Sequence, residues 1–447
     1  MMKPANGRGC LVSSSTRPTR TSFLRSTQRG NRLAHLLLLV SLLSLSQTRP
    51  QAKILPSPER VKLGNEVLFQ QFPAELRDKR LGLVINQTSV LPNGPTLLAR
   101  LLADGHRVTA IFTPEHGLAG AAEGGWPIED GLWKKIKVYS LYGKQLRPSP
   151  EQLRDVDALI YDIQDVGTRF YTYITTLKYV LEAAAAASVP VCVLDRPNPL
   201  GGRIVEGPVL KKQYESFIAA LPIPTRYGLT AGELALMMKG EGWVPGNASL
   251  QVIRMANWTR NQTWGSTGLP WIPTSPNIPT PESALLYPGT GLFGGIRLNQ
   301  GLGTPHPFRQ FGAPWLDSEV LLSRLPGEEE LRARLSPVTY TPVALPDKVM
   351  TPPYKDRLCR GLRLLVLDEE RFLSLRFALI VIKTLKDLYP EEISVGSALL
   401  DQMFGDDSLA RFIEGKLSPE ELLRLMEMDE NAFDRRRQRY LLYPDQE

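Results

Sequence analysis

The chain has 447 residues, enough for two domains or one large one, and its 43% apolar and 22% charged residues are ordinary for a globular protein. The formal net charge of +7 arises in the first 50 residues, which carry eight Lys or Arg and no acid, so the remaining chain has 45 basic and 46 acidic residues. A nearly neutral folded part gives no electrostatic reason to expect nucleic-acid binding.

The N-terminal segment has the pattern of a targeting sequence. Residues 36–45 form a ten-residue apolar run, LLLLVSLLSL, after a basic lead; this is too short to span a bilayer and typical of a signal peptide. We therefore expect residues 1–52 to be a signal or targeting presequence, and the protein to be secreted or held in the secretory-pathway lumen. Because the lead is long, rich in Arg and Ser and free of acids, a mitochondrial transit peptide is the alternative.

Two further sequence patterns concern the cellular localisation of the protein. Four Asn-x-Ser/Thr triplets agree with a secretory route and a glycoprotein, and they begin at Asn86, Asn247, Asn257 and Asn261. No later stretch is long and apolar enough for a membrane helix, so we expect no membrane span in the mature chain.

Apolar strands alternate with helices along the first half of the mature chain. The pattern predicts strands over 81–85, 107–112, 137–141, 158–161, 190–194 and 250–255, and helices over 61–72, 96–104, 150–154, 171–187 and 230–240. Continuous apolar strands between helices indicate parallel pairing with both faces of the sheet covered. Residues 53–265 are therefore predicted to form a Rossmann-like α/β domain.

A loop-rich, proline-rich stretch over 257–303 follows, and we place the domain boundary there. Beyond it, the pattern predicts a strand over 362–367 and helices over 318–325, 373–389 and 419–428. Residues 266–447 are expected to form a smaller C-terminal α+β domain that completes a cleft.

Polar side chains follow three of the predicted parallel strands, where open α/β sheets bind their ligands. These side chains are Glu115 and His116, then Asp165 with Arg169, then Asp195 and Arg196 with Asn198. We expect the three acids to gather at one edge of the sheet and to face one sugar-sized hollow. Each group alone has a structural alternative, as a helix cap or a buried ion pair.

Several motifs that mark particular classes of catalytic or binding site are missing from the sequence. There is no glycine-rich phosphate loop, no Gly-x-Ser-x-Gly nucleophile turn and no clustered His or Cys, so we expect no nucleotide or dinucleotide site and no metal site built from His or Cys. Carboxylates beside aromatic, Arg and Asn residues suit a sugar, and glycoside hydrolysis typically uses two carboxyl groups. Glu115 is the best candidate for the acid, because Pro114 and Phe112 beside it shield it partly from water. The alternative is a solvated loop glutamate.

These motifs together resemble the bacterial exo-β-N-acetylmuramidase family. The matching stretches run in order from about Leu81 to Tyr443, and the longest is the most specific. They are 114–117 (PEHG), 139–143 (YSLYG), 162–173 (DIQDVGTRFYTY), 194–199 (LDRPNP), 205–208 (VEGP), 228–234 (GLTAGEL), 276–280 (PNIPT) and 287–289 (YPG).

The resemblance implies a Rossmann-like domain and a smaller C-terminal domain with the site in the cleft between them. It implies removal of N-acetylmuramic acid from the non-reducing ends of peptidoglycan fragments, without a cofactor, and so an amino-sugar glycan or peptidoglycan fragment as the partner. Glu115 would be a catalytic carboxylate, with Glu123 as the second candidate. The predicted substrate-binding residues are His116, Asp165, Arg169, Tyr171, Tyr173, Asp195, Arg196, Asn198, Glu206 and Asn277.

The sequence also departs from this family. Where the family tends to read Phe-Glu-Gly-Thr-Asn, this chain has FGGIR over 293–297, and where the family tends to read Ser-Glu-Gly-Arg-Gly-Thr, it has NQGLGT over 299–304. A family glutamate that follows Ala-Gly is replaced near Gly125-Trp126, and Glu123 is the possible stand-in. Because losing an acid or base costs orders of magnitude in rate, two hypotheses follow: an active glycosidase, or a glycan-binding relative that has lost turnover.

Overall fold

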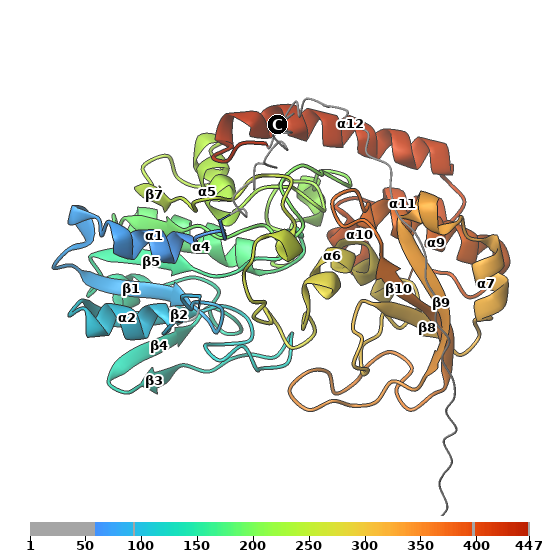
Figure 1. The fold of residues 1–447 in the computed structure, drawn as a ribbon, viewed down its shortest axis with the longest axis horizontal. Coiled ribbons are helices and arrows are strands. Elements are labelled where there is room, and N and C mark those ends of the chain that lie inside the picture. The colour runs from blue at the N-terminus through green and yellow to red at the C-terminus, as the bar shows by residue number, and fades with distance from the viewer. Residues whose placement is uncertain (1–58, 93, 396–397, 446–447) are drawn as a thin grey trace, which may run out of the picture. The chain divides into compact units, whose positions relative to one another are not determined.

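The computed structural model of the protein describes residues 59–92, 94–395 and 398–445, so the predicted presequence lies outside the described residues. Residues Ser57–Glu447 form one compact unit. Within it, a seven-stranded sheet and a three-stranded sheet are each covered by helices (Figure 1). The α/β class predicted from the sequence is confirmed.

The larger sheet has the strand order β3-β4-β2-β1-β5-β6-β7. All neighbouring pairs are parallel except β3 and β4. The strands are β1 (Arg80–Ile85), β2 (Arg107–Thr113), β3 (Gly131–Trp133), β4 (Ile136–Ser140), β5 (Ala158–Asp162), β6 (Val191–Leu194) and β7 (Leu250–Ile253). Six of them were predicted, whereas β3 was missed because its three residues are exposed or half-buried and leave no apolar run.

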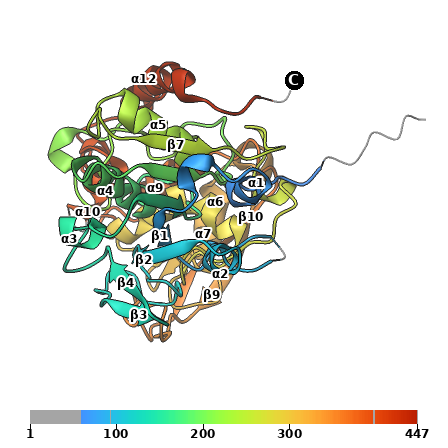
Figure 2. The same cartoon turned by 90° about the vertical axis from the view of Figure 1, so that its left-hand side faces the viewer.

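Helices cover both faces of this sheet (Figure 2). Leu68, Leu97 and Leu101 of α1 and α2 pack on one face, and Leu177, Leu181 and Leu234 of α4 and α5 pack on the other. Successive strand residues alternate between these two cores, as Leu83 and Val84 do. The helices are α1 (Gly64–Gln70), α2 (Leu97–Ala103), α3 (Pro150–Leu153), α4 (Tyr173–Ala186) and α5 (Ala231–Gly240).

The C-terminal part is built on the antiparallel sheet β8-β10-β9. Its strands are β8 (Gln310–Ala313), β9 (Ala333–Tyr340) and β10 (Cys359–Val366), and its helices are α6 (Pro281–Thr290), α7 (Ser318–Arg324), α8 (Glu328–Leu331), α9 (Ser374–Leu388), α10 (Leu399–Phe404), α11 (Ser408–Ile413) and α12 (Pro419–Arg437). Short 3-10 turns complete the described residues: η1 (Ala74–Leu76), η2 (Lys212–Tyr214), η3 (Trp264–Ser266), η4 (Gly291–Gly295) and η5 (Gln438–Tyr440).

In the C-terminal part, the sequence did not predict helices α6, α8, α10 and α11, and α12 is longer than predicted. The proline-rich stretch predicted as loop contains α6, because Thr280 caps its first turn at the Ser283 amide and Pro281 occupies its first position, where a missing N–H costs nothing. Helix α12 continues beyond Met428 to Arg437, because no Gly or Pro interrupts it.

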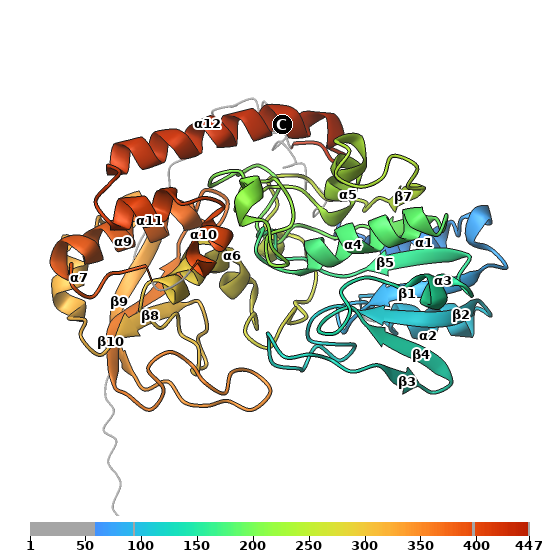
Figure 3. The same cartoon turned by 180° about the vertical axis from the view of Figure 1, so that it is seen from behind.

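Helix α12 contacts both halves of the chain and leads to the C-terminal tail (Figure 3). Glu430 of α12 pairs with Arg376 of α9 at 2.9 Å, and Arg436 donates to Glu241, which follows α5, at 2.7 Å. The end of the chain is therefore attached to the first half.

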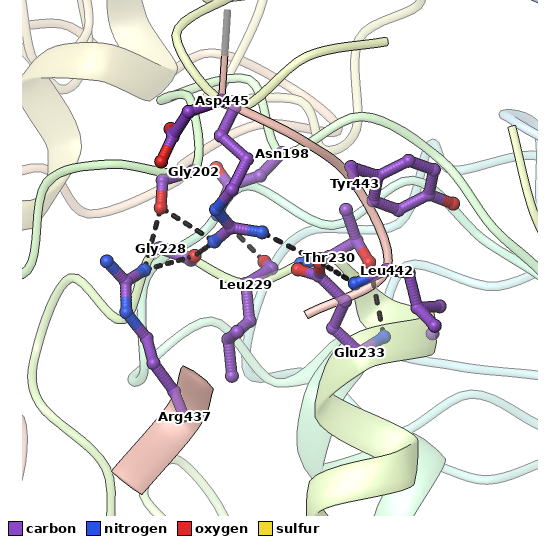
Figure 4. Close-up of polar contacts among 12 residues, drawn as sticks. Asn198, Gly202, Gly228, Leu229, Thr230, Glu233, Arg437, Leu442, Tyr443 and Asp445 are labelled. Carbon is purple, nitrogen blue, oxygen red and sulfur yellow. Dashed lines mark hydrogen bonds and ion pairs between the residues drawn. The ribbon is translucent and has the colours of Figure 1, made fainter. Parts of the chain in front are cut away.

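The attachment consists of the buried arginines Arg260 and Arg437 and of Tyr443, whose hydroxyl donates to Asp195 at 2.6 Å (Figure 4). Arg260 and Arg437 both donate to the carbonyl oxygens of Gly202 and Gly228. Glu233 of α5 joins them, since its carboxylate pairs with Arg260 at 2.7 Å and accepts the backbone N–H of Leu442 at 2.8 Å. We call this set the C-terminal clamp.

Candidate active site

The turn after β2 places Glu115 at the carboxyl end of the larger sheet. The chain reverses sharply there, because His116 and Gly117 both have left-handed backbones, with φ of +71° and +74°. The His116 ring fixes the turn, since its Nδ1 lies 2.6 Å from the Ala122 carbonyl oxygen. The predicted substrate residue His116 is thus buried and shapes the loop that follows Glu115.

Three segments hold the Glu115 carboxylate. Its Oε1 accepts the Gly125 N–H at 2.8 Å, and its Oε2 accepts the Thr172 hydroxyl at 2.7 Å. The Tyr142 phenol also bonds to Glu115; burial and this negative charge raise the pKa of Tyr142 well above its ordinary range, which keeps it a donor. Because Thr172 is the N-cap residue of α4, the carboxylate lies at a helix N-terminus, where negative charge is favoured. Glu115 is therefore held in one orientation while its side chain is only half-buried.

Tyrosine rings form a wall beside Glu115. The Tyr171 and Tyr173 rings meet edge to face at 4.7 Å, and Tyr287 of α6 lies 6.1 Å from Tyr171. The Tyr173 hydroxyl donates to the Thr274 carbonyl oxygen at 2.7 Å and lies 3.4 Å from that of Glu115. Burial raises the pKa of each of these tyrosines well above the ordinary range, so the wall is uncharged. The structure thus brings Tyr171 and Tyr173 to Glu115, but as packed side chains.

Glu123 and Asn277 hold a loop of the C-terminal part against the Glu115 loop. Glu123 Oε1 accepts the Met350 N–H at 2.8 Å, and Asn277 Nδ2 donates to the Lys348 carbonyl oxygen at 3.0 Å. Glu123 lies on the same loop as Gly125, so it is close in sequence to the contacts of Glu115. One oxygen of Glu123 serves the loop contact, and its role as a second catalytic carboxylate stays a prediction.

Asp165 and Arg169 are directed into the protein. Asp165 Oδ2 accepts the Gly167 N–H at 2.7 Å and the Tyr227 hydroxyl. The Arg169 guanidinium has no exposed surface and donates to three carbonyl oxygens, those of Pro208, Ile223 and Met403. Burial lowers the pKa of Arg169 to about 9. These contacts join the central loop to the end of α10 and leave Arg169 no access to a bound sugar.

Asp195 is also enclosed, because it organises the start of α5 and the C-terminal tail. Its Oδ1 accepts the Gly232 N–H at 2.8 Å, and its Oδ2 accepts the hydroxyls of Thr230 at 2.7 Å and Tyr443 at 2.6 Å. Burial raises the pKa of Asp195 to about 6, against the effect of these donors. Asp195 is fully buried, and both of its carboxylate oxygens are occupied by these internal donors.

The remaining predicted substrate residues also make internal contacts. Arg196 pairs with Asp162 at 2.6 Å, and Asn198 donates to the Leu229 carbonyl oxygen at 2.9 Å. Glu206 pairs with buried Arg226 at 3.3 Å and accepts two N–H groups at the start of α9. A polar residue after a strand can satisfy backbone groups as well as ligands, and these three do so.

The three acids expected at one hollow do not share one. A hollow of about 270 Å³ lies outside the carboxyl ends of β1, β5 and β6, and its polar lining comprises Thr88, Gln164 and Arg196. The other lining residues are Leu63, Val90, Leu91, Pro92, Gly94, Trp264, Leu269, Pro270 and Ile272. Glu115, Asp165 and Asp195 are not part of this lining, because the latter two turn inward to the hydrogen bonds described above. Glu115 is therefore the centre of a separate candidate site.

The buried Asp165 predicts a pH-dependent stability. Burial raises the pKa of Asp165 to about 6, so the folded protein binds more protons than the unfolded chain between about pH 4 and 6. The stabilisation is present below this window and lost as the pH rises through it. We expect the contribution of Asp165 to the free energy of unfolding to be about 1 kcal/mol larger at pH 5 than at pH 7.5. Urea unfolding of wild type and Asp165→Asn at both pH values measures this difference, and equal pH dependence in the two proteins would refute it.

Gly294 and Gln300, where the resembled motifs tend to read Glu, are neighbours in the fold. A Cβ on Gly294 would lie 2.8 Å from Gln300 Nε2. The Gln300 carbonyl oxygen accepts the Phe308 N–H at 2.7 Å, and the Phe308 ring lies 4.7 Å from Tyr287 of the tyrosine wall. Position 300 is thus joined through its backbone to the residue whose ring packs on Tyr287.

Sequence reasoning missed Thr172, Gly125 and Tyr142 as contacts of Glu115. Thr172 carries a recognisable signal, since it is a threonine just before a helix that follows a parallel strand. Gly125 and Tyr142 carry none, because their contacts depend on how the 114–130 loop folds back onto the end of β4. Among the described residues, no group of three His, Cys, Asp or Glu side chains is arranged to hold a metal ion.

Comparison with known proteins gives the same assignment from both halves of the chain. The family model for the N-terminal domain of exo-beta-N-acetylmuramidase NamZ matches residues 81–282, and the model for its C-terminal domain matches residues 285–443. The peptidoglycan beta-N-acetylmuramidase NamZ of Bacillus subtilis (strain 168) is 39% identical over 394 residues, covering 86% of this chain and 92% of that protein.

Solved structures agree. Two crystal structures of DUF1343 family proteins from Bacteroides fragilis NCTC 9343 match with TM-scores of 0.77 and 0.71, at 34% and 32% identity. They cover 86% and 87% of this chain, and the matches span 99% and 100% of those chains. On the two family models and this identity, the chain belongs to the exo-β-N-acetylmuramidase NamZ family.

Proposed function

We propose that this protein is a glycoside hydrolase that removes N-acetylmuramic acid from the non-reducing ends of peptidoglycan fragments. Family membership supports the reaction, since a relative 39% identical over most of the chain is a peptidoglycan beta-N-acetylmuramidase. The observation that carries the proposal is the Glu115 carboxylate, held by Gly125, Thr172 and Tyr142 at the carboxyl end of the sheet. This is the setting in which α/β proteins present reacting groups.

The held carboxylate suits a proton-transferring or charge-stabilising role. Its donors fix its direction, so little reorganisation is needed when charge develops on the sugar. Glycosidases commonly place a second carboxyl across the bond, and Glu123 on the same loop is our candidate for it.

Release of sugar from a chromogenic β-N-acetylmuramide tests the proposal directly. We expect wild-type protein to release the chromophore and to release N-acetylmuramic acid from peptidoglycan fragments. Tight binding of the fragments without any release would instead support a glycan-binding relative. That second function is favoured by Gly294 and Gln300, which stand where the family tends to carry acids.

We further propose that the protein is secreted or lies in the secretory-pathway lumen, with mitochondrial import as the alternative. The support is the basic lead and the apolar run at residues 36–45, which lie outside the described part of the structure. None of the helices formed by the described residues is long and apolar enough to cross a membrane.

A secretory route predicts a specific glycosylation pattern. Asn247 is exposed, whereas Asn86 is buried, and its Oδ1 accepts the Thr88 N–H at 2.9 Å and the Thr88 hydroxyl at 2.6 Å. A glycan on Asn86 would prevent the end of β1 from packing, so we expect folded protein from secretory expression to carry glycan on Asn247 and none on Asn86. Peptide mass spectrometry after enzymatic deglycosylation in heavy-oxygen water measures both sites. A glycan on Asn86 in folded protein would contradict the packing around β1.

A further inference from the structure

Trp126 is a large apolar side chain left in solvent beside the candidate active site. It is 61% exposed, whereas Trp258 and Trp264 are 2% and 6% exposed. Within the described part of the chain, Trp126 belongs to none of the buried apolar clusters. A single exposed apolar side chain is common on soluble proteins, so its meaning depends on whether it is fixed in place.

The backbone on both sides of Trp126 is fixed by the residues of the site. The preceding residue, Gly125, donates its N–H to Glu115 Oε1 at 2.8 Å. Two residues later, the Ile128 N–H donates to the Tyr142 carbonyl oxygen at 3.2 Å. Because Glu115 and Tyr142 are the two ends of this attachment, Trp126 is held at the rim of the site.

A second apolar side chain reaches the same loop from the C-terminal part. Met350 is 44% exposed, and its N–H donates to Glu123 Oε1 at 2.8 Å. Glu123 also contacts Trp126 directly, because the Glu123 carbonyl oxygen accepts the Trp126 N–H at 3.4 Å. Glu123 therefore contacts the backbone of an exposed aromatic residue, Trp126, on its own loop and of an exposed thioether residue, Met350, on the facing loop.

We propose that Trp126 is the stacking platform for the sugar ring on the leaving-group side of the bond that is cleaved. The inference rests on the proposed function and adds the residue that recognises the remainder of the glycan. The hydroxyls of Thr172 and Tyr142 surround Glu115 and suit the terminal sugar, whereas Trp126 lies one residue outside the Gly125 contact and is open to solvent. A β-linked pyranose with equatorial substituents presents a flat face of C–H groups, which an indole ring covers well.

The chemistry of the rim favours a sugar over a peptide as the occupant. An extended peptide would need backbone partners or charged pockets. The Trp126 amide is already bonded to Glu123, and the Gly125 amide is bonded to Glu115. What the rim leaves free is an apolar ring, and one face of a pyranose matches it in size.

Two substrates that differ only beyond the cleaved bond test the platform. One is a β-linked disaccharide with N-acetylmuramic acid at the non-reducing end and N-acetylglucosamine as leaving group, and the other is methyl β-N-acetylmuramide, whose leaving group has no ring. We expect Trp126→Ala to lower kcat/KM roughly tenfold more for the disaccharide than for the methyl glycoside, mainly through KM. Trp126→Phe should recover part of this loss.

Leu132→Ala is the matched control, because Leu132 is 72% exposed on the same connection between β2 and β4 but belongs to strand β3, where it pairs with Lys137 of β4. Leu132→Ala should leave kcat/KM unchanged for both substrates. If Trp126→Ala lowers kcat/KM equally for both substrates, or for neither, Trp126 is not the stacking platform. If wild-type protein hydrolyses neither substrate, the proposed hydrolase function fails. The platform is then decided by calorimetric titration with the disaccharide, where binding that is unchanged in Trp126→Ala, or absent in wild type, overturns it.

Discussion

Replacing Glu115 by Gln is expected to abolish sugar release, with kcat at least about a thousandfold below wild type. Glutamine keeps the size of the side chain but can neither deliver nor accept a proton in the reaction. It also exchanges one carboxylate oxygen for an NH₂ group, which cannot accept the hydrogen bond that Gly125 or Thr172 now donates. Steady-state kinetics with the chromogenic β-N-acetylmuramide, together with a thermal unfolding midpoint for each protein, measures the effect.

Glu129→Gln is the control for this variant. Glu129 follows Glu115 on the same loop, its side chain is 73% exposed, and it forms an ion pair with Lys144 at the surface. We expect its activity and its unfolding midpoint to match wild type. An activity of Glu115→Gln above one tenth of wild type would show that Glu115 is not the reacting carboxylate. Full binding of fragments by a wild-type protein that has no activity would favour the non-catalytic relative.

The largest stability effect is expected from Arg169→Ala, with a loss of about 3–5 kcal/mol in the free energy of unfolding. The guanidinium is fully buried and donates at 2.8 Å or less to the carbonyl oxygens of Pro208, Ile223 and Met403. Removing it takes this donor from all three buried carbonyl oxygens, of which that of Ile223 keeps the Leu210 N–H at 3.3 Å, and opens a cavity. Urea unfolding followed by tryptophan fluorescence, with the same m value assumed for both proteins, gives the difference.

Arg334→Ala is the matched control, because its side chain is 54% exposed and forms a surface ion pair with Glu328 at 2.8 Å. Such pairs contribute about 0–1 kcal/mol. The comparison also decides between two roles for Arg169. If Arg169→Ala keeps wild-type stability and loses affinity for the disaccharide, the residue binds substrate, as the sequence predicted, and the structural role is wrong.

The fold was predictable to a large extent because its signals are local. The strands of the larger sheet except β3 are short apolar runs, and the helices that follow β1, β4 and β6 begin at a recognisable cap, which is Thr96, Ser149 and Thr230. The antiparallel sheet was harder. β9 contains Pro337 and alternates buried with exposed residues, and its pairing with β10 depends on contacts that sequence periodicity does not record.

The sequence predicted where Glu115 lies along the sheet, but it did not predict which way the neighbouring polar side chains point. Glu115 lies where the end of a parallel strand predicts a functional group. The same rule also selected Asp195, which instead accepts hydrogen bonds from Thr230, 35 residues away, and from Tyr443, 248 residues away. The position of a polar residue after a strand indicates where it lies along the sheet, but its direction depends on donors elsewhere in the chain.

The C-terminal clamp has a consequence for biosynthesis. Arg437 supplies a contact to Gly228, Leu442 one to α5, and Tyr443 one to Asp195 after β6, so these binding positions stay empty until residue 443 has been translated. The nascent α/β half therefore cannot reach its final state before residues 437–443 have left the ribosome. A stop codon in place of Gln438 would release a protein that has the whole Glu115 loop but lacks the hydrogen bonds of Leu442 to Glu233 and of Tyr443 to Asp195.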